Sequence, residues 1–154
     1  MTATIASDDQ ITTLRRRVMR ALADSPAEDI ATCMSSVDVP ASKELRLPES
    51  GLVMIRGRIG GDGAPFNFGE ATVTRAAVRL ESGEMGFSYV LGRDPRKARL
   101  MAICDAMVQS AHGGRILEFI VAPLERAMIA RRQRKDAQTA ATRVNFFTLV
   151  RGED

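Results

Sequence analysis

Reactive side chains are scarce in this sequence. Its 154 residues include one histidine, His112, and two cysteines, Cys33 and Cys104, which lie far apart and form no Cys-x-x-Cys motif. One histidine and two scattered cysteines cannot build a zinc site of the usual histidine and cysteine type, and no Ser-His-Asp arrangement stands out. We therefore expect no metal site and assign no catalytic residue. His112 is expected at the surface or beside a helix end.

Common phosphate-binding and membrane-targeting motifs are also missing. The chain has no GxxxxGK[ST] loop and no GxGxxG that opens a helix. No apolar run approaches the roughly 18 residues of a membrane span. The N-terminal MTATIASDDQ has neither the basic nor the apolar region of a secretory signal. Because its cysteines also suit a reducing compartment, we expect a cytoplasmic protein without membrane contact.

The composition is that of one globular domain. Apolar residues make up 45% of the chain and charged residues 27%, which is enough for a single core. Aromatic residues are only 5%, so the core must rest on Leu, Ile, Val, Met and Ala. The net charge of +3 is too small to indicate a nucleic-acid-binding protein. We predict a flexible tail at residues 1–8 and a single domain at 9–154.

Two helices and a strand are predicted in the N-terminal part of the chain. Apolar residues recur at helical spacing over 9–23, and a second helix is expected over 26–36. Ser25, which is followed by proline, is expected to cap that second helix. A short extended connection over 40–48 is bracketed by prolines. Four successive apolar residues then predict a strand over 52–59.

A hairpin is predicted from strands over 70–80 and 84–91, with residues 82–83 as its loop. This loop places three pairs on the core face: Leu80 opposite Met85, Val78 opposite Phe87, and Ala76 opposite Tyr89. The other face sets an arginine and an alanine against Gly86 and Ser88. Such small side chains leave room for solvent or for another chain to approach.

Helices dominate the C-terminal part. Asp94, which is followed by proline, predicts a capped helix start, and the glycine pair at 113–114 is expected to stop that helix. Pro123 is expected to break or kink the next helical segment, after which 124–141 is strongly helical. A strand over 143–151 is apolar on both faces. The predicted fold class is α+β: a small antiparallel sheet, a three-stranded meander plus the C-terminal strand, with helices before and after it.

The glycine-rich stretch after the strand at 52–59 is the best candidate for a ligand-binding loop. The four glycines of 57–63 allow backbone N–H groups to converge on an anion, and Arg56 and Arg58 can add charge-assisted bonds. The alternative is an ordinary connection whose glycines adopt positive φ. Beside it, two phenylalanines flank Asn67, so that Asn67 and Glu70 can hydrogen-bond a sugar, a base or a neighbouring subunit.

Two arginines of the following strand share one face. Arg75 and Arg79 are four residues apart, which suits a phosphate clamp and equally suits ordinary solvated charges. The candidate ligand-binding or interface residues are Arg56, Arg58, Gly60, Gly61, Gly63, Asn67, Glu70, Thr74 and Arg75.

The helix and connection over 126–143 are basic, with six Arg or Lys residues and one acid, Asp136. One hypothesis is a stand-alone module that binds a polyanion or RNA through this helix. Others are a solvated helix face, because no aromatic residues interleave to stack bases, and docking onto an acidic groove of a partner. The candidate partner-docking residues are Phe66, Phe68, Arg131, Arg132, Phe146, Phe147 and Arg151.

Three ordered segments resemble the PhnG family, a small subunit of the bacterial carbon–phosphorus lyase system. They are GLVMIRGRIGGDGAPFNFGEATVTRAAVRL (51–80), YVLGRD (89–94) and NFFTLVRGED (145–154). The resemblance spans about 14–154, and it implies an accessory subunit of the synthase that displaces adenine from ATP with a phosphonate. The product is α-D-ribose 1-methylphosphonate 5-triphosphate.

The resemblance also implies partners. PhnI-like, PhnH-like and PhnJ-like subunits and a PhnL-like protein of the ATP-binding-cassette type are expected. ATP is then a substrate of the complex, and no cofactor is expected on this chain alone. In the family the nucleosidase chemistry belongs to PhnI, which agrees with the shortage of catalytic groups here. Nucleic acid is an unlikely partner on this interpretation.

Overall fold

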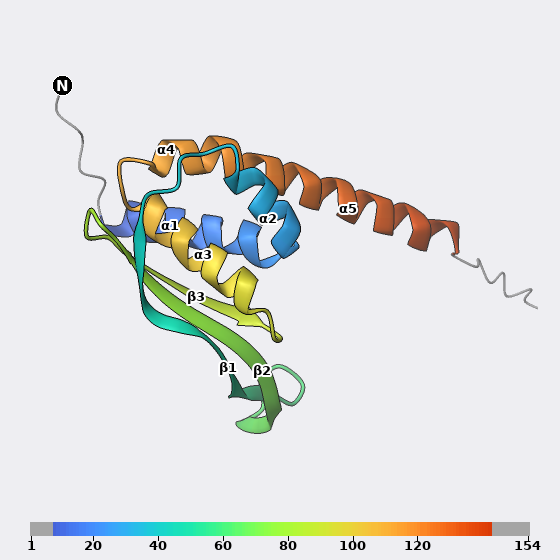
Figure 1. Ribbon diagram of the computed structural model, residues 1–154. Coiled ribbons are helices and arrows are strands. Elements are labelled where there is room, and N and C mark those ends of the chain that lie inside the picture. The colour runs from blue at the N-terminus through green and yellow to red at the C-terminus, as the bar shows by residue number, and fades with distance from the viewer. Residues whose placement is uncertain (1–7, 143–154) are drawn as a thin grey trace, which may run out of the picture.

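The computed structural model describes residues 8–142 (Figure 1). In chain order the elements are α1 Asp8–Ala23, α2 Ala27–Met34, β1 Ser42–Arg58, β2 Pro65–Leu80, β3 Met85–Leu91, α3 Pro95–Val108, α4 Gly113–Ile116, a π-helical turn Leu117–Val121, and α5 Ala122–Ala141. The predicted α+β class and the three-stranded antiparallel meander, in the order β1-β2-β3, are confirmed. The predicted strand over 143–151 lies outside the described residues. So does the predicted tail, apart from Asp8, which begins α1.

The core lies between one face of the sheet and the helices. In Figure 1, α3 lies across the sheet, and α1, α2 and α5 lie on the far side of α3. Fully buried aliphatic side chains from both layers fill this space, because the chain has few aromatic residues to do so. The largest are Leu22, Ile30, Leu80, Met101, Met107, Ile116, Ile120 and Leu124.

β1 is longer than predicted. The expected connection over 40–48 and the strand over 52–59 form one strand from Ser42 to Arg58. Pro48 lies where the register between β1 and β2 shifts, between Arg46 and Glu49. A proline is tolerated there because β1 is an edge strand and a bulge needs no ladder hydrogen bond at that position.

The predicted register of the β2–β3 hairpin is wrong by one residue. The loop has three residues, because Leu80 donates its N–H to the carbonyl of Glu84 at 2.9 Å and Gly83 has a φ of 109°. A shift of one residue moves every side chain of β3 to the other face. The core face therefore holds Gly86, Ser88 and Val90, while Met85, Phe87 and Tyr89 lie on the opposite face of the sheet, with Phe87 beside Arg16 and Met19 of α1.

The small residues of β3 are occupied by the chain itself. A Cβ at Gly86 would lie 1.9 Å from the carbonyl oxygen of Ala102, so α3 packs directly on the β3 backbone. The hydroxyl of Ser88 donates to the carbonyl of Ala98 at 2.7 Å. The room that these residues leave is thus filled by α3, neither by solvent nor by another chain.

Of the two predicted helix caps, only one is confirmed. Asp94 accepts a hydrogen bond from the N–H of Lys97 at 2.8 Å and begins α3. The cap at Ser25 is wrong: its buried hydroxyl donates back to the carbonyl of Ala21 at 2.7 Å, and α2 begins after Pro26 with no side-chain cap.

Two predicted helix breaks differ from the structure. α3 ends at Val108, before the glycine pair, and Gly113 instead begins α4, close to the carbonyl of Val108, where a Cβ would lie 2.7 Å away. Pro123 does not break the helix. The π-helical turn Leu117–Val121 precedes it, so Pro123 falls in the first turn of α5, where its missing N–H is tolerated.

A buried carboxylate missed by the sequence interpretation links the two layers. Asp105 on α3 is 1% exposed and accepts two hydrogen bonds from Arg15 of α1, at 2.9 and 2.8 Å. It also accepts the N–H of Phe87 on β3 at 2.9 Å. The Asp105 carboxylate is therefore ion-paired with Arg15 and hydrogen-bonded to the backbone of β3, as a buried carboxylate requires.

Candidate functional site

The β1–β2 tip, residues 56–70, projects beyond the helical layer (Figure 1). Its turn is closed by the N–H of Gly63, which donates to the carbonyl of Ile59 at 3.1 Å. Gly60 and Gly61 have φ of 64° and 86°, and a Cβ at Gly63 would lie 2.6 Å from the Ile59 oxygen. The backbone conformation of the turn therefore accounts for these three glycines.

The charged candidates of the tip lie at the surface. Arg56 pairs in register with Asn67, and both are exposed. Arg58 donates to the carbonyl of Gly63 at 3.1 Å, so it braces the turn. Glu70 is exposed and lies opposite Met54.

The two phenylalanines of the tip form an exposed aromatic pair. Phe66 and Phe68 have ring centroids 6.4 Å apart in an edge-to-face arrangement. Phe68 is 73% exposed, and the ring of Phe66 lies over Gly57. This pair is the part of the tip best suited to insert into another surface.

Thr74 is already engaged within the chain. It is fully buried, and its hydroxyl donates to the carbonyl of Gly92 at 2.7 Å and accepts the N–H of Asp94 at 3.1 Å. Ser50 lies within hydrogen-bond distance of the same oxygen, at 3.0 Å. These contacts hold the turn between β3 and α3.

The sheet face opposite the one that α3 covers carries exposed apolar side chains, and we call it the open face. Its exposed apolar members come from the two edge strands, β1 and β3. They are Val53, Ile55, Met85, Phe87, Tyr89 and Leu91, with exposed fractions from 37% to 78%. Exposed apolar side chains gathered on one face are typical of an interface with another molecule.

Arginines cross the middle of the open face. Arg75 donates to Glu49 at 2.8 Å, and Glu49 also pairs with Arg46. Hydrogen bonds from Arg46 and then Arg75 lower the pKa of Glu49, while hydrogen bonds to Tyr89 and then Glu49 raise the pKa of Arg75. Arg79 shares this face and contacts the sulfur of Met85 at 3.6 Å. A phosphate would have to compete with Glu49 for Arg75.

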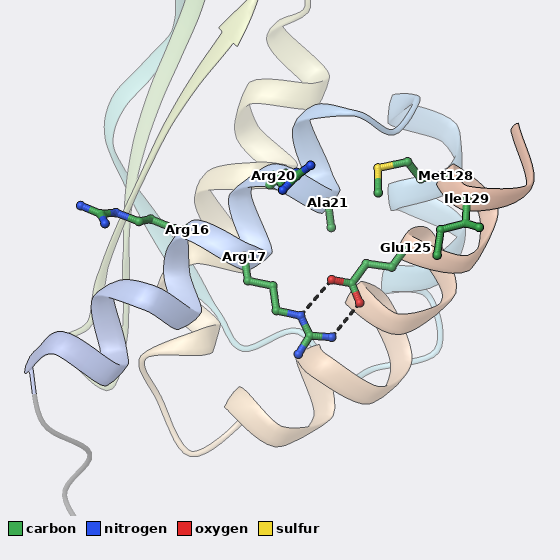
Figure 2. A pocket seen from close by; sticks show the side chains of 7 residues that line it. All are labelled: Arg16, Arg17, Arg20, Ala21, Glu125, Met128 and Ile129. Atoms are coloured by element: carbon green, nitrogen blue, oxygen red, sulfur yellow. Dashed lines mark hydrogen bonds and ion pairs between the residues drawn. The ribbon is translucent and has the colours of Figure 1, made fainter. Parts of the chain in front are cut away.

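A groove lies between α1 and α5, and we call it the α1–α5 groove (Figure 2). It encloses about 520 Å³. Arg17 makes two hydrogen bonds to Glu125 across it, at 2.8 and 2.7 Å, which lowers the pKa of Glu125. The other lining residues are Arg16, Arg20, Ala21, Met128 and Ile129.

The predicted docking arginines of α5 differ in their surroundings. Arg131 bonds to the carbonyl of Asp24 at 2.9 Å and to the carboxylate of Asp29 at 3.2 Å, so it fastens α5 to the body. Arg132 is exposed. Phe146, Phe147 and Arg151 lie outside the described residues.

The structure separates the predicted site residues into two groups. It brings Arg75 to the open face and places Arg56, Asn67 and the phenylalanine pair on the tip. Sequence reasoning missed the exposed side chains of β3 and the arginines of α1. The signal for β3 was its strict alternation of large and small residues in MGFSYVL, which is consistent with either face being buried.

Neither a membrane-spanning helix nor a cluster of metal ligands is found in the described part of the chain. None of its helices is long and apolar enough to cross a membrane. Over residues 8–142, no group of three or more His, Cys, Asp or Glu side chains is arranged to hold a metal ion.

Comparison with known proteins identifies a family and a relative. The model of a family described as phosphonate metabolism protein PhnG matches residues 13–152. A Rhizobium meliloti (strain 1021) protein, described as alpha-D-ribose 1-methylphosphonate 5-triphosphate synthase subunit PhnG, is 47% identical over 155 aligned positions. The alignment covers 100% of this chain and 99% of that protein.

Proposed function

Because this chain belongs to the PhnG family, we propose that it is an accessory subunit of an α-D-ribose 1-methylphosphonate 5-triphosphate synthase. The observation that carries this proposal is the 47% identity to a subunit of that synthase along the whole length of both proteins. An alignment of this extent supports the subunit role for the chain as a whole.

The chemistry of the chain supports an accessory role. Glu70, a candidate hydrogen-bonding carboxylate, is exposed on the projecting tip, and over the described residues no group of three or more His, Cys, Asp or Glu side chains is arranged to hold a metal ion. The thiol of Cys104 is no candidate nucleophile, since burial raises its pKa to about 12. The reacting groups are therefore expected on other subunits.

We further propose a reaction for the synthase and a set of partner subunits. The complete synthase displaces adenine from ATP with a phosphonate, and ATP binds to the complex rather than to this chain alone. PhnI-like, PhnH-like and PhnJ-like subunits and a PhnL-like protein are the proposed partners, in the cytoplasm. The open face, with its exposed Phe87 and Tyr89, is the surface best suited to a subunit contact.

Reconstitution of the synthase tests this proposal. The chain is co-expressed with the PhnH-like, PhnI-like and PhnL-like proteins of the same genome, and adenine release from ATP plus methylphosphonate is measured. We expect release only when this chain is present, and none from the chain alone. A full rate without it, or a chain that fails to co-purify with any of these proteins, would refute the proposal.

The tip supplies a sharper prediction within the same assay. If it reaches the nucleotide, Asn67→Ala or Arg58→Ala should lower kcat/KM for ATP at least about tenfold, as loss of a polar transition-state contact does. Met54→Ala, on β1 just outside the tip, is the control. Unchanged kinetics in an intact complex would remove the tip from the nucleotide site and leave the subunit assignment standing.

A further inference from the structure

The distal part of α5 has no support from the rest of the described chain. Residues 132–142, which we call the α5 arm, are all exposed, and Figure 1 shows α5 extending past the other helices. The last contacts with the body are those of Arg131 with Asp24 and Asp29. A helical segment of this length is marginal in water without tertiary packing, so the arm is a natural place for another molecule to bind.

The α1–α5 groove lies at the root of the arm and has an apolar floor. Ala21 of α1 and Met128 and Ile129 of α5 line it (Figure 2), and Ile129 is 52% exposed. Arg132 follows Met128 by four residues and Ile129 by three, so it continues the same face of α5 onto the arm. The groove and the arm thus form one continuous strip.

This strip has an excess of positive charge. Arg16 and Arg20 line the groove, are exposed and form no ion pair with any described residue. Glu125 is the acidic residue of the groove, and Arg17 already pairs with it. On the face that continues the groove, the arm adds Arg132 and Lys135 against a single acid, Asp136.

We infer that the strip binds an acidic, amphipathic helix of another subunit of the synthase. This inference rests on the proposed function. The apolar side of the incoming helix covers Met128 and Ile129, and its carboxylates pair with Arg20 and Arg132. Binding gives the arm tertiary packing, and it gives the unpaired guanidinium groups of Arg20 and Arg132 bidentate acceptors.

The same observations disfavour nucleic acid as the occupant. Single-stranded nucleic acid is bound by basic grooves in which aromatic side chains stack on the bases, and α5 contains no aromatic residue. The floor is aliphatic and half-exposed, which suits a helix face better than a phosphate backbone.

Charge reversal along the strip tests the inference. In the co-expressed complex, Arg20→Glu combined with Arg132→Glu should weaken binding of this chain at least about tenfold, because like charges then face the acidic helix. The single variant Arg132→Glu has a matched control in Arg134→Glu, which makes the same change about 200° around the helix. This control should bind within about twofold of the wild type.

Cross-linking identifies the occupant directly. A photo-reactive amino acid in place of Ile129 should capture, in the assembled complex, an acidic helical peptide of another subunit. Equal weakening by all the arginine variants together with retardation of single-stranded RNA would assign the strip to a polyanion and overturn the inference. So would an intact complex with no cross-link, or a cross-link to a peptide without acidic residues. Failure of the wild type to join any complex would instead overturn the proposed function, and this inference with it.

Discussion

At Gly86 the backbone of β3 meets the backbone of α3. The atoms nearest to a Cβ built there are the carbonyl oxygen of Ala102 at 1.9 Å and the N–H nitrogen of Ala106 at 2.5 Å. Neither can rotate away as the end of a side chain can. Because Gly86 has no Cβ, the backbones of α3 and β3 can pack this closely.

We predict that Gly86→Ala destabilises the fold by about 2 kcal/mol or more, since the helix must move to admit the added carbon. The free energy of unfolding, measured by urea titration, checks this. Gly51→Ala is the control, because a Cβ there meets nothing within 4 Å and φ is not positive. Equal stability of the two variants would contradict the close packing described here.

At the scale of elements, single polar contacts fasten α5 to the other helices. Arg17 of α1 reaches Glu125, and Arg131 reaches the loop and helix that follow α1. The apolar contribution of α5 is concentrated at Leu124, its buried residue. The attachment of α5 is therefore more sensitive to pH and salt than that of α3, which is buried along nearly its whole length.

The Arg17–Glu125 pair predicts a pH dependence. Arg17 lowers the pKa of Glu125 in the folded chain from its ordinary value near 4.5. The stabilisation is thus fully present above about pH 4.5 and is lost as the pH falls through the lowered value. Because the pair is largely exposed, the effect is expected to be small. The difference in unfolding free energy between wild type and Glu125→Gln should therefore shrink as the pH falls below 4.5, and a constant difference would exclude the pair as its cause.

At the scale of the whole molecule, the helices cover only one side of the sheet. On β2 from Thr74 to Leu80 and on β3 from Gly86 to Val90, the covered face is lined by small or fully buried residues, whereas the open face carries exposed large apolar side chains on β1 and β3. Such a distribution is unfavourable for a solitary chain and favourable for a subunit.

We predict that Phe87→Thr with Tyr89→Thr leaves the stability of the isolated chain within about 1 kcal/mol, because both side chains are about half exposed. The same variant should bind the synthase partners at least about tenfold more weakly. Phe119→Thr, which changes a similarly exposed side chain on the helical layer, should bind normally. Urea titration measures the free energy of unfolding, and co-purification measures binding to the partners. Normal assembly of the double variant would move the interface elsewhere.

The sequence was sufficient for the α+β class, the three-strand meander, the Asp94 cap and the family, because each depends on local pattern or on an ordered match along the chain. It did not decide which face of β3 is buried. The alternation in MGFSYVL is compatible with both faces, and a loop of two or three residues selects between them. Only the packing of α3 on Gly86, with Asp105 holding the Phe87 N–H, resolves that choice. The open face and the groove likewise exist only in the folded chain, since each joins residues from strands or helices far apart in sequence.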